Sequence, residues 1–255
     1  DFGRFLQFDS LFLRETTRVN HHTYKFARRA AAEGLVVVDD PDSILKCTNK
    51  VFLAELLQRH KITVPKSLIA HRGNQEQVLE SIGLPCILKQ PDSSFSKGVL
   101  KVDSGRQFNE ELGKLLQKSD LVIAQEFMPT DFDWRIGIFD RKLLYACKYY
   151  MASKHWQILK RTANGKQVEG IAETFPVEEV PLAVCQTALK AANLIGNGFY
   201  GVDLKQIGKK IYVIEINDNP SIDAGVEDRI LKDNLYLEIM QVIMERVELK
   251  KGRKQ

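Results

Sequence analysis

The stretch FYGVDLKQIGKKIYVIEINDNP, residues 199–220, is the most informative part of this sequence. It holds two runs rich in apolar and β-branched residues, FYGVDLKQI and IYVIEIN, on either side of a Gly-Lys-Lys segment. Two such runs around a short loop that contains glycine predict a β-hairpin. The second run ends unusually, because Glu215 and Asn217 stand where apolar residues would suit a buried strand better.

The hydrophobic pattern favours one register for this hairpin. A three-residue loop beginning at Gly208 places Val202 opposite Ile216, so that apolar residues meet. A two-residue loop would slip the register by one residue and set Val202 against Glu215. The pattern therefore predicts the three-residue loop, which brings Asp203 directly opposite Glu215.

The predicted register gathers oxygen ligands. Facing carboxylates repel each other across a sheet, so a positive group is expected between Asp203 and Glu215. Asn217 shares the face of Glu215 at the period of two, as do Ile211 and Val213, which indicates a covered face. Carboxylate and amide oxygens are ligands that Mg²⁺ and Mn²⁺ prefer. We predict a metal site at the three polar residues; a solvated face that carries acids by chance is the alternative.

The composition is that of an ordinary globular chain. The 255 residues suffice for one large domain or two modest ones, with 44% apolar and 27% charged residues. A net charge of +4 is too small to indicate a nucleic-acid partner, and the basic tail KKGRKQ is interpreted as a solvated helix end. The four cysteines lie far apart without a C-x-x-C motif, which favours a reducing cytoplasm. No apolar run approaches the length of a membrane span, so no membrane partner is expected.

The other predicted elements alternate irregularly, which indicates an α+β class rather than a doubly wound sheet. Helices are predicted at residues 22–33, 49–60, 107–118, 181–195 and 227–249, and strands at 35–38, 86–90, 99–102, 121–127, 134–139 and 142–150. Asn20 is expected to cap the first helix, and Asp42 or Ser43 a short one after it. The chain lacks an initiator Met and opens on DFGRFLQFDSLFLRE, so we expect a fragment that lacks an N-terminal part.

Polar groups also stand at the ends of other predicted strands. Lys89 ends the run PCILK before the small-residue loop PDSSFSKG, and a cation beside backbone amides can hold phosphate. The strand AQEFM, residues 124–128, runs into a loop whose backbone could contact an adenine edge. Asp133 and Arg135 lie two residues apart and face the same way. A surface lysine and a structural ion pair are the plain alternatives.

His21 and His22 are a second candidate pair of metal ligands. Adjacent residues on a helix point about 100° apart, so they cannot easily share one ion. We therefore expect both histidines to have structural roles.

The order of these segments identifies a family. The chain shows the same order of segments as the ATP-grasp carboxylate–amine ligases. This order is a strand that ends in lysine, a small-residue loop, and then Q-E-F, D-W-R, G-V-D and E-I-N-D-N-P. Over residues 45–245 the chain resembles the RimK-type glutamate ligases. RETTRVNHHTYKFARRA, DDPDSILKCTNK and KYYMASKHWQI resemble a RimK-like subgroup with an additional N-terminal region. The resemblance implies an α+β ATP-grasp fold whose two subdomains, residues 47–125 and 126–255, grip ATP, after an α/β remnant at residues 1–46.

The resemblance also implies a nucleotide site. Its expected residues are Lys50, Lys89, Ser94, Ser96, Lys97, Gly98, Glu126, Phe127 and Asp133. Lys89 would contact the ATP phosphates beneath a mobile lid loop at residues 94–98. Glu126 and Phe127 would form the adenine hinge, and Asp133 would touch the ribose. The family's lid loop is often glycine-rich, but serine hydroxyls can also donate to phosphate.

The catalytic residue implied by the resemblance is Arg135, near the transferred phosphate or the acyl intermediate. Asp203, Glu215 and Asn217 would bind two Mg²⁺ ions, with Glu215 bridging and Mn²⁺ as an alternative metal. Residues 148–161 depart from the best-known relatives and would line the acceptor side. The substrate candidates there are His155, Trp156 and Lys160. The alternatives are that His155 is an ordinary loop histidine and that Trp156 packs in the core.

The implied activity is ATP-dependent amide formation through an acyl phosphate. The implied amine is glutamate or a glutamate-like amino acid, and the carboxylate acceptor stays open. A protein that binds ATP on the same fold to regulate or scaffold, without turnover, is the alternative; a ligase of glutathione-synthase-like substrate choice is a nearer one. The complete oxygen ligand set favours an enzyme. Oligomeric relatives suggest a homo-oligomer.

Overall fold

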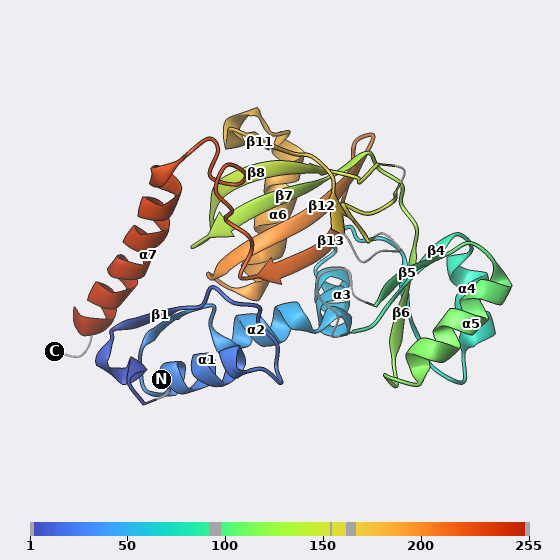
Figure 1. Ribbon diagram of the computed structural model, residues 1–255, viewed down its shortest axis with the longest axis horizontal. Coiled ribbons are helices and arrows are strands. Elements are labelled where there is room, and N and C mark those ends of the chain that lie inside the picture. The colour runs from blue at the N-terminus through green and yellow to red at the C-terminus, as the bar shows by residue number, and fades with distance from the viewer. Residues whose placement is uncertain (1–2, 92–97, 154, 162–166, 253–255) are drawn as a thin grey trace.

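The fold is built from two large antiparallel sheets and a small N-terminal unit (Figure 1). The computed structural model describes residues 3–91, 98–153, 155–161 and 167–252. The helices in these ranges are α1 (His22–Ala32), α2 (Pro41–Thr48), α3 (Lys50–Arg59), α4 (Gln75–Ile82), α5 (Gly105–Leu116), α6 (Leu182–Ile195) and α7 (Asp233–Gly252). The strands are β1 (Ser10–Phe12), β2 (Val36–Val38), β3 (Ser67–Ala70), β4 (Cys86–Lys89), β5 (Val99–Val102), β6 (Val122–Glu126), β7 (Phe132–Phe139), β8 (Lys142–Tyr150), β9 (Leu159–Arg161), β10 (Gln167–Glu169), β11 (Ala172–Phe175), β12 (Phe199–Ile207) and β13 (Lys210–Asp218).

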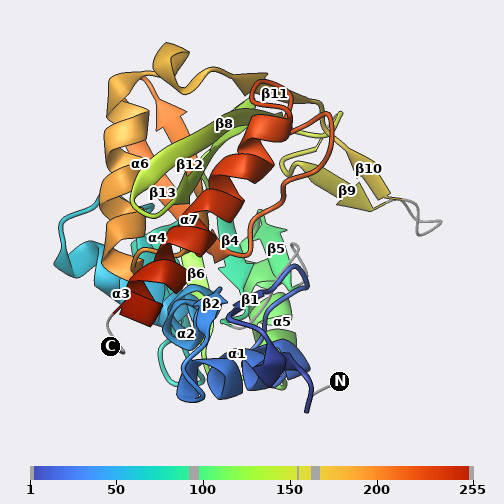
Figure 2. The ribbon, with the colours of Figure 1, turned by 90° about the vertical axis from the view of Figure 1, so that its left-hand side faces the viewer.

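The larger sheet has the strand order β11-β8-β7-β12-β13. Trp134, Ile136 and Ile138 of β7 point to one face, where they are buried in a core with α6 and α3. The alternate residue Phe139 belongs to a second core with α7. Figure 2 shows α6 and α7 on different sides of this sheet. Because the faces alternate along a strand, Arg135 shares the α7 side, beyond the part that the helix covers.

The smaller sheet has the order β3-β6-β4-β5 and carries α4 and α5 on one face (Figure 1). Cys86, Leu88 and Ala124 point into the core beneath these helices. The predicted strands at residues 86–90 and 99–102 are confirmed, and β4 pairs antiparallel with β5. The alternate positions, among them Lys89, face away from the helices and toward the larger sheet.

The β12–β13 hairpin reaches the predicted pairing by a different route. Asp203 lies opposite Glu215, as predicted. The predicted three-residue loop is wrong, because Ile207 pairs with Lys210 and leaves a two-residue loop. That loop alone would slip the register, but a β-bulge gives β13 an extra residue, Ile214, and restores the pairing at the functional end.

The bulge also changes the face to which each residue of β13 points. Ile211, Val213 and Ile216 all lie in the core with α6, whereas Glu215 and Asn217 line a cavity. The predicted sharing of one face by Ile211, Val213 and Glu215 is therefore wrong. The extra residue lets β13 bury Ile211, Val213 and Ile216 and still present its polar pair to the cavity.

Two predicted helix caps are wrong. α1 begins after His21 rather than Asn20, because His21 has an extended backbone (φ −112°, ψ 160°). α2 begins with Pro41 after Asp40, whose carboxylate accepts the backbone N–H groups of Asp42 and Ser43. Proline at the first helical position fixes the start of this helix.

The described helices include none that is both long and apolar enough to cross a bilayer. The cysteines Cys47, Cys86, Cys147 and Cys185 are all buried free thiols.

Gly201 marks a close approach between β12 and the loop after β13. A Cβ atom at Gly201 would lie 2.8 Å from the Cβ of Pro220. We expect Gly201→Ala to lower the free energy of unfolding by about 1–3 kcal/mol, because the proline ring must shift. The matched control is Gly113→Ala within α5, where an added Cβ meets nothing within 4 Å. There alanine should stabilise the chain by about 0.5–1 kcal/mol. Urea unfolding of both variants checks this, and equal effects would contradict the close approach.

Candidate functional site

A cavity of about 1250 Å³ lies between the two large sheets. One wall comes from β4 and β6, and the other from β7, β12 and β13. Residues 16–20 and 156–159 line it as well. Ligand pockets usually measure about 300–1,000 Å³, so this cavity has room for more than one small molecule.

Two ion pairs run side by side across β7 and β12. Arg135 lies opposite Asp203 and donates to both of its oxygens, Nε to Oδ1 at 2.7 Å and one terminal nitrogen to Oδ2 at 2.8 Å. Burial alone would lower the pKa of Arg135, but Asp203 more than offsets it, so the pKa is raised. Lys205 Nζ lies 2.6 Å from Asp133 Oδ1. Burial raises the pKa of Asp133, and Lys205 opposes that shift.

The three predicted metal ligands lie together on β12 and β13. Asp203 and Glu215 are cross-strand partners, and Asn217 Nδ2 donates to Asp203 Oδ2 at 3.2 Å. Lys50 Nζ donates to Glu215 Oε1 at 2.6 Å. Burial alone would raise the pKa of Glu215, but Lys50, together with the more distant Lys89 and Arg135, lowers it. The expected positive charge beside the two acids is thus present as Lys50 and Arg135.

Lys89 lies on the opposite wall of the cavity. Its Nζ donates to Gln125 Oε1 at 2.7 Å. Burial lowers the pKa of Lys89 to about 8; Glu215 opposes this shift, while Lys50 and Lys205 add to it. An anion that enters the cavity would strongly stabilise the charged form of a lysine that is held among other cations.

The predicted hinge residues Glu126 and Phe127 also line the cavity. Glu126 Oε1 accepts the backbone N–H of Lys66 at 2.7 Å. The Phe127 ring meets that of Trp156 edge-on, with centroids 6.0 Å apart. Gly98, with φ of 75°, accepts the backbone N–H of Gln90 and is not among the lining residues. The predicted lid residues Ser94, Ser96 and Lys97 lie outside the described residues.

The predicted substrate residues differ in their positions. Trp156 lines the cavity, whereas His155 is not among the lining residues. The His155 ring lies 5.8 Å from that of Trp156, and its Nε2 is 3.3 Å from Gln157 Oε1. Lys160 belongs to β9, and its side chain lies outside what the structure describes.

Several lining residues escaped prediction. Lys205 stands two residues after Asp203, so the period of a strand places both on one face and would have found it. Nothing in the spacing of residues in the N-terminal segment predicts that part of it lines the cavity. Thr17 donates to Asp218, and Arg14 donates to Asn219 Oδ1 at 2.6 Å. These contacts join residues about two hundred positions apart in the sequence, so spacing cannot reveal them.

Comparison with known proteins is consistent with this geometry. Residues 47–243 match the family described as RimK-like ATP-grasp domain. The chain is 28% identical over 192 residues to the alpha-aminoadipate–LysW ligase LysX of Sulfurisphaera tokodaii, a match that covers 72% of this chain and 63% of LysX. It is 24% identical over 252 residues to the tetrahydromethanopterin:alpha-L-glutamate ligase of Methanocaldococcus jannaschii, covering 95% and 79%. The chain therefore spans less than two thirds of LysX.

Among solved structures, the fold is similar to that of D-alanine–D-alanine ligase from Bacillus anthracis. The TM-score is 0.74 at 14% sequence identity, and the match covers 96% of this chain and 82% of that one. At this identity the likeness concerns the fold.

Proposed function

Because this chain belongs to the RimK-like ATP-grasp family, we propose that it is an ATP-dependent ligase that joins a carboxylate to an amine. One observation carries the proposal. Lys89 on the smaller sheet shares a cavity with Asp203, Glu215 and Asn217 on the larger one. A cation for phosphate on one wall and oxygen ligands on the other form a complete set for phosphoryl transfer.

In the proposed nucleotide site, Lys89 holds the phosphates and Glu126 and Phe127 contact the adenine. Lys50 and Arg135 add positive charge close to the oxygen ligands. Asp133 remains our candidate for the ribose contact. It would have to share its carboxylate with Lys205, to which it is bound at 2.6 Å.

Asp203, Glu215 and Asn217 fit Mg²⁺. All three offer oxygen atoms, and the lowered pKa of Glu215 keeps its carboxylate ionised. We propose that this set holds two ions with Glu215 shared, and that Mn²⁺ can substitute. Bound Mg²⁺ neutralises the charge that develops on the transferred phosphoryl group.

The proposed reaction has two steps. A carboxylate oxygen of one substrate attacks the γ-phosphorus of ATP, the bond to the β-phosphate oxygen breaks, and ADP and an acyl phosphate form. An amine then attacks the acyl carbon, phosphate leaves, and the amine loses a proton. Arg135, held by two bonds to Asp203, would stabilise the negative charge of the acyl phosphate. The enclosing sheets would limit hydrolysis of this intermediate by water.

The relatives suggest the amine. One is named for α-aminoadipate and another for L-glutamate, both amino acids with two carboxylates. We propose glutamate or a similar amino acid as the amine substrate of this chain. The carboxylate acceptor would lie toward Trp156, on the side of the cavity where residues 156–159 line it.

We also propose a division into two subdomains, residues 47–125 and 126–255, with residues 1–46 as the end of an α/β domain. The two large sheets support this division. Leu53 and Leu57 of α3, however, pack in the core of the larger sheet. The free cysteines are in keeping with a cytoplasmic location, and we propose a homo-oligomer by analogy with the family.

The proposed activity is tested by ADP release with Mg²⁺-ATP, a panel of amino acids that includes glutamate and α-aminoadipate, and a panel of carboxylates. Mass spectrometry should find a product equal to the two substrates minus one water. ADP release that depends on both an amine and a carboxylate supports the ligase. Tight binding of Mg²⁺-ATP without turnover for any combination would favour an ATP-binding regulatory protein.

Lys89 should make nucleotide binding depend on pH. Lys89→Gln should weaken ADP binding about tenfold to a hundredfold, because it removes a charged hydrogen bond. In the wild-type chain the pKa of Lys89 is about 8, so the free cation is lost above that pH. Its ADP affinity should therefore fall as pH rises above about 8, by up to about tenfold per pH unit.

The matched control is Lys89→Arg, which keeps a positive charge at every pH of the titration. Its ADP affinity should not change over this range. Calorimetric titration from neutral pH upward checks both chains, and the same decline in the arginine variant would remove Lys89 from the explanation.

A further inference from the structure

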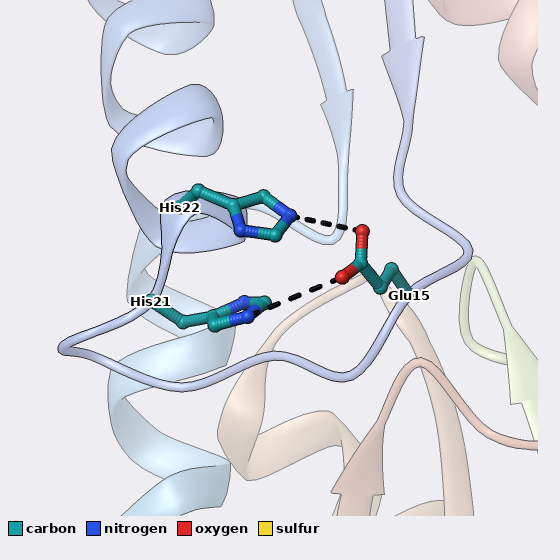
Figure 3. A group of neighbouring side chains, drawn as sticks. All are labelled: Glu15, His21 and His22. Carbon is teal, nitrogen blue, oxygen red and sulfur yellow. Dashed lines mark hydrogen bonds and ion pairs between the residues drawn. The ribbon is translucent and has the colours of Figure 1, made fainter.

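A group of metal-ligating side chains lies at the start of α1, outside the lining of the cavity (Figure 3). Glu15, His21 and His22 each offer one ligand atom, and these atoms all lie within 4.8 Å of one another. His22 Nε2 is 2.9 Å from Glu15 Oε2, and His21 Nε2 is 4.0 Å from Glu15 Oε1. Both imidazoles thus face one carboxylate.

The expectation that the two histidines diverge is wrong. It assumed that both belong to the helix, but His21 is the extended residue before α1 and His22 is the first helical one. This change of backbone direction brings the two rings together, with centroids 3.9 Å apart and planes tilted by 38°. Their ring nitrogens can therefore reach a common point, which two adjacent helical residues could not do.

A buried threonine orients the His21 ring. Thr23 is 2% exposed, and its hydroxyl donates to the backbone carbonyl of Thr16 at 3.2 Å. A hydroxyl has one proton, so Thr23 Oγ1 accepts from His21 Nδ1 at 3.0 Å. The proton on Nδ1 leaves the Nε2 atom of His21 with a lone pair directed toward Glu15. A cation placed between this nitrogen and the Glu15 carboxylate would be bound by both acceptors.

We propose that Glu15, His21 and His22 form a Zn²⁺ site, distinct from the proposed Mg²⁺ site. Two imidazoles and one carboxylate, with water as the fourth ligand, are a common zinc set. Ligand atoms around a tetrahedral zinc lie about 3.3 Å apart, given bonds of about 2.0–2.1 Å. The observed 2.9 Å and 4.0 Å lie on either side of that separation. Imidazole nitrogens select against Mg²⁺, which prefers oxygen ligands.

The surroundings of the three ligands suit a bound metal. Glu15 is 60% exposed and His22 53% exposed, which leaves access for the ion and a water ligand. A cation at the N-terminus of a helix is opposed by the helix dipole, and the Glu15 carboxylate offsets that cost. Thr23 supplies the outer hydrogen bond that metal-bound histidines almost always make.

The site would act on the cavity through the segment that it closes. Residues 16–20 lie between the ligands and line the cavity. The backbone carbonyl of Glu15 accepts a hydrogen bond from Asn219 Nδ2 at 2.7 Å. Asn219 lies two residues after the proposed metal ligand Asn217. Zinc would join the two ends of the segment 16–20, one of which Glu15 holds against the loop that follows β13. This consequence concerns access to the cavity, whatever reaction takes place inside it.

The test is a titration of the chain with Zn²⁺, in a buffer with excess Mg²⁺ and a chromophoric chelator that competes for zinc. The wild-type chain should bind one Zn²⁺, and native mass spectrometry should show the same ratio. Glu15→Gln and His22→Gln should each abolish this binding. The matched control, His60→Gln at the end of α3, should bind as the wild type does. Unchanged stoichiometry in His22→Gln, or no binding by the wild type, would overturn the proposal.

A second variant tests the orientation of the ring. Thr23→Val keeps the shape of the side chain but removes the acceptor for His21 Nδ1. Its Zn²⁺ affinity should fall by about tenfold or more, the usual effect of losing an outer partner. Circular dichroism and the unfolding midpoint without metal show that the variant is folded. An unchanged Zn²⁺ affinity in the folded variant would contradict the assigned tautomer and the site built on it.

Discussion

Glu215→Gln should remove Mg²⁺-dependent ADP release, lowering the rate by about a thousandfold. The substitution keeps the size of the side chain but replaces an ionised carboxylate, which pairs with Lys50 at 2.6 Å, by a neutral amide. A metal ion stabilises the transition state by several kcal/mol, and each loss of about 1.4 kcal/mol is tenfold in rate. Steady-state ADP release over a range of Mg²⁺ concentrations measures the effect.

The matched control for this change is Glu173→Gln. Glu173 lies on β11 of the same sheet and accepts a hydrogen bond from Tyr150. Glu173 is not among the residues that line the cavity, so ADP release by the Glu173→Gln variant should stay close to the wild-type rate. Full turnover by Glu215→Gln would remove Glu215 from the metal site, and a similar loss in both variants would indicate a general effect on the sheet.

Arg135→Lys should lower kcat about a hundredfold while the KM for ATP changes little. The arginine fork makes two bonds to Asp203, at 2.7 Å and 2.8 Å, and the Tyr149 ring lies against it at 5.1 Å. A lysine is a point charge and cannot keep both bonds or the planar contact. Loss of one well-placed donor typically costs about a hundredfold to a thousandfold in kcat.

The control for the arginine is Arg141→Lys in the exposed turn between β7 and β8. This variant makes the same chemical change on the β7–β8 hairpin, but at the turn, away from the pairing of Arg135 with Asp203. It should leave kcat unaltered. A rise in the KM for ATP with kcat unchanged in Arg135→Lys would instead assign Arg135 to nucleotide binding.

Part of this site followed from the sequence because burial of apolar residues restricts it. The pairing of Val202 with Ile216 fixes Asp203 opposite Glu215, whatever happens at the far end of the hairpin. The loop length did not follow, since a bulge at Ile214 and a shorter loop give the same pairing at the cavity end. Hydrophobic pattern reports which residues are buried, and it leaves the count of residues between two buried pairs open.

Other features depend on contacts that no local pattern encodes. The pairing of Lys50 with Glu215 joins α3 to β13 and requires the two to meet in three dimensions. The same holds for Thr17 and Asp218. The histidine pair depends on a smaller difference: with Asn20 as the cap His21 would belong to the helix, but His21 is itself the extended cap residue and turns toward Glu15.

We propose that the residues of this cavity catalyse transfer of phosphate from ATP to a carboxylate before the amide forms. The most direct measurement uses a carboxylate substrate labelled with heavy oxygen, chosen from the combinations that support ADP release. If an acyl phosphate forms, one labelled oxygen must leave with the phosphate. We expect mass spectrometry to find the label in inorganic phosphate, with one labelled phosphate for each amide formed. Label in AMP, or phosphate without label beside a fully formed amide, would exclude an acyl phosphate.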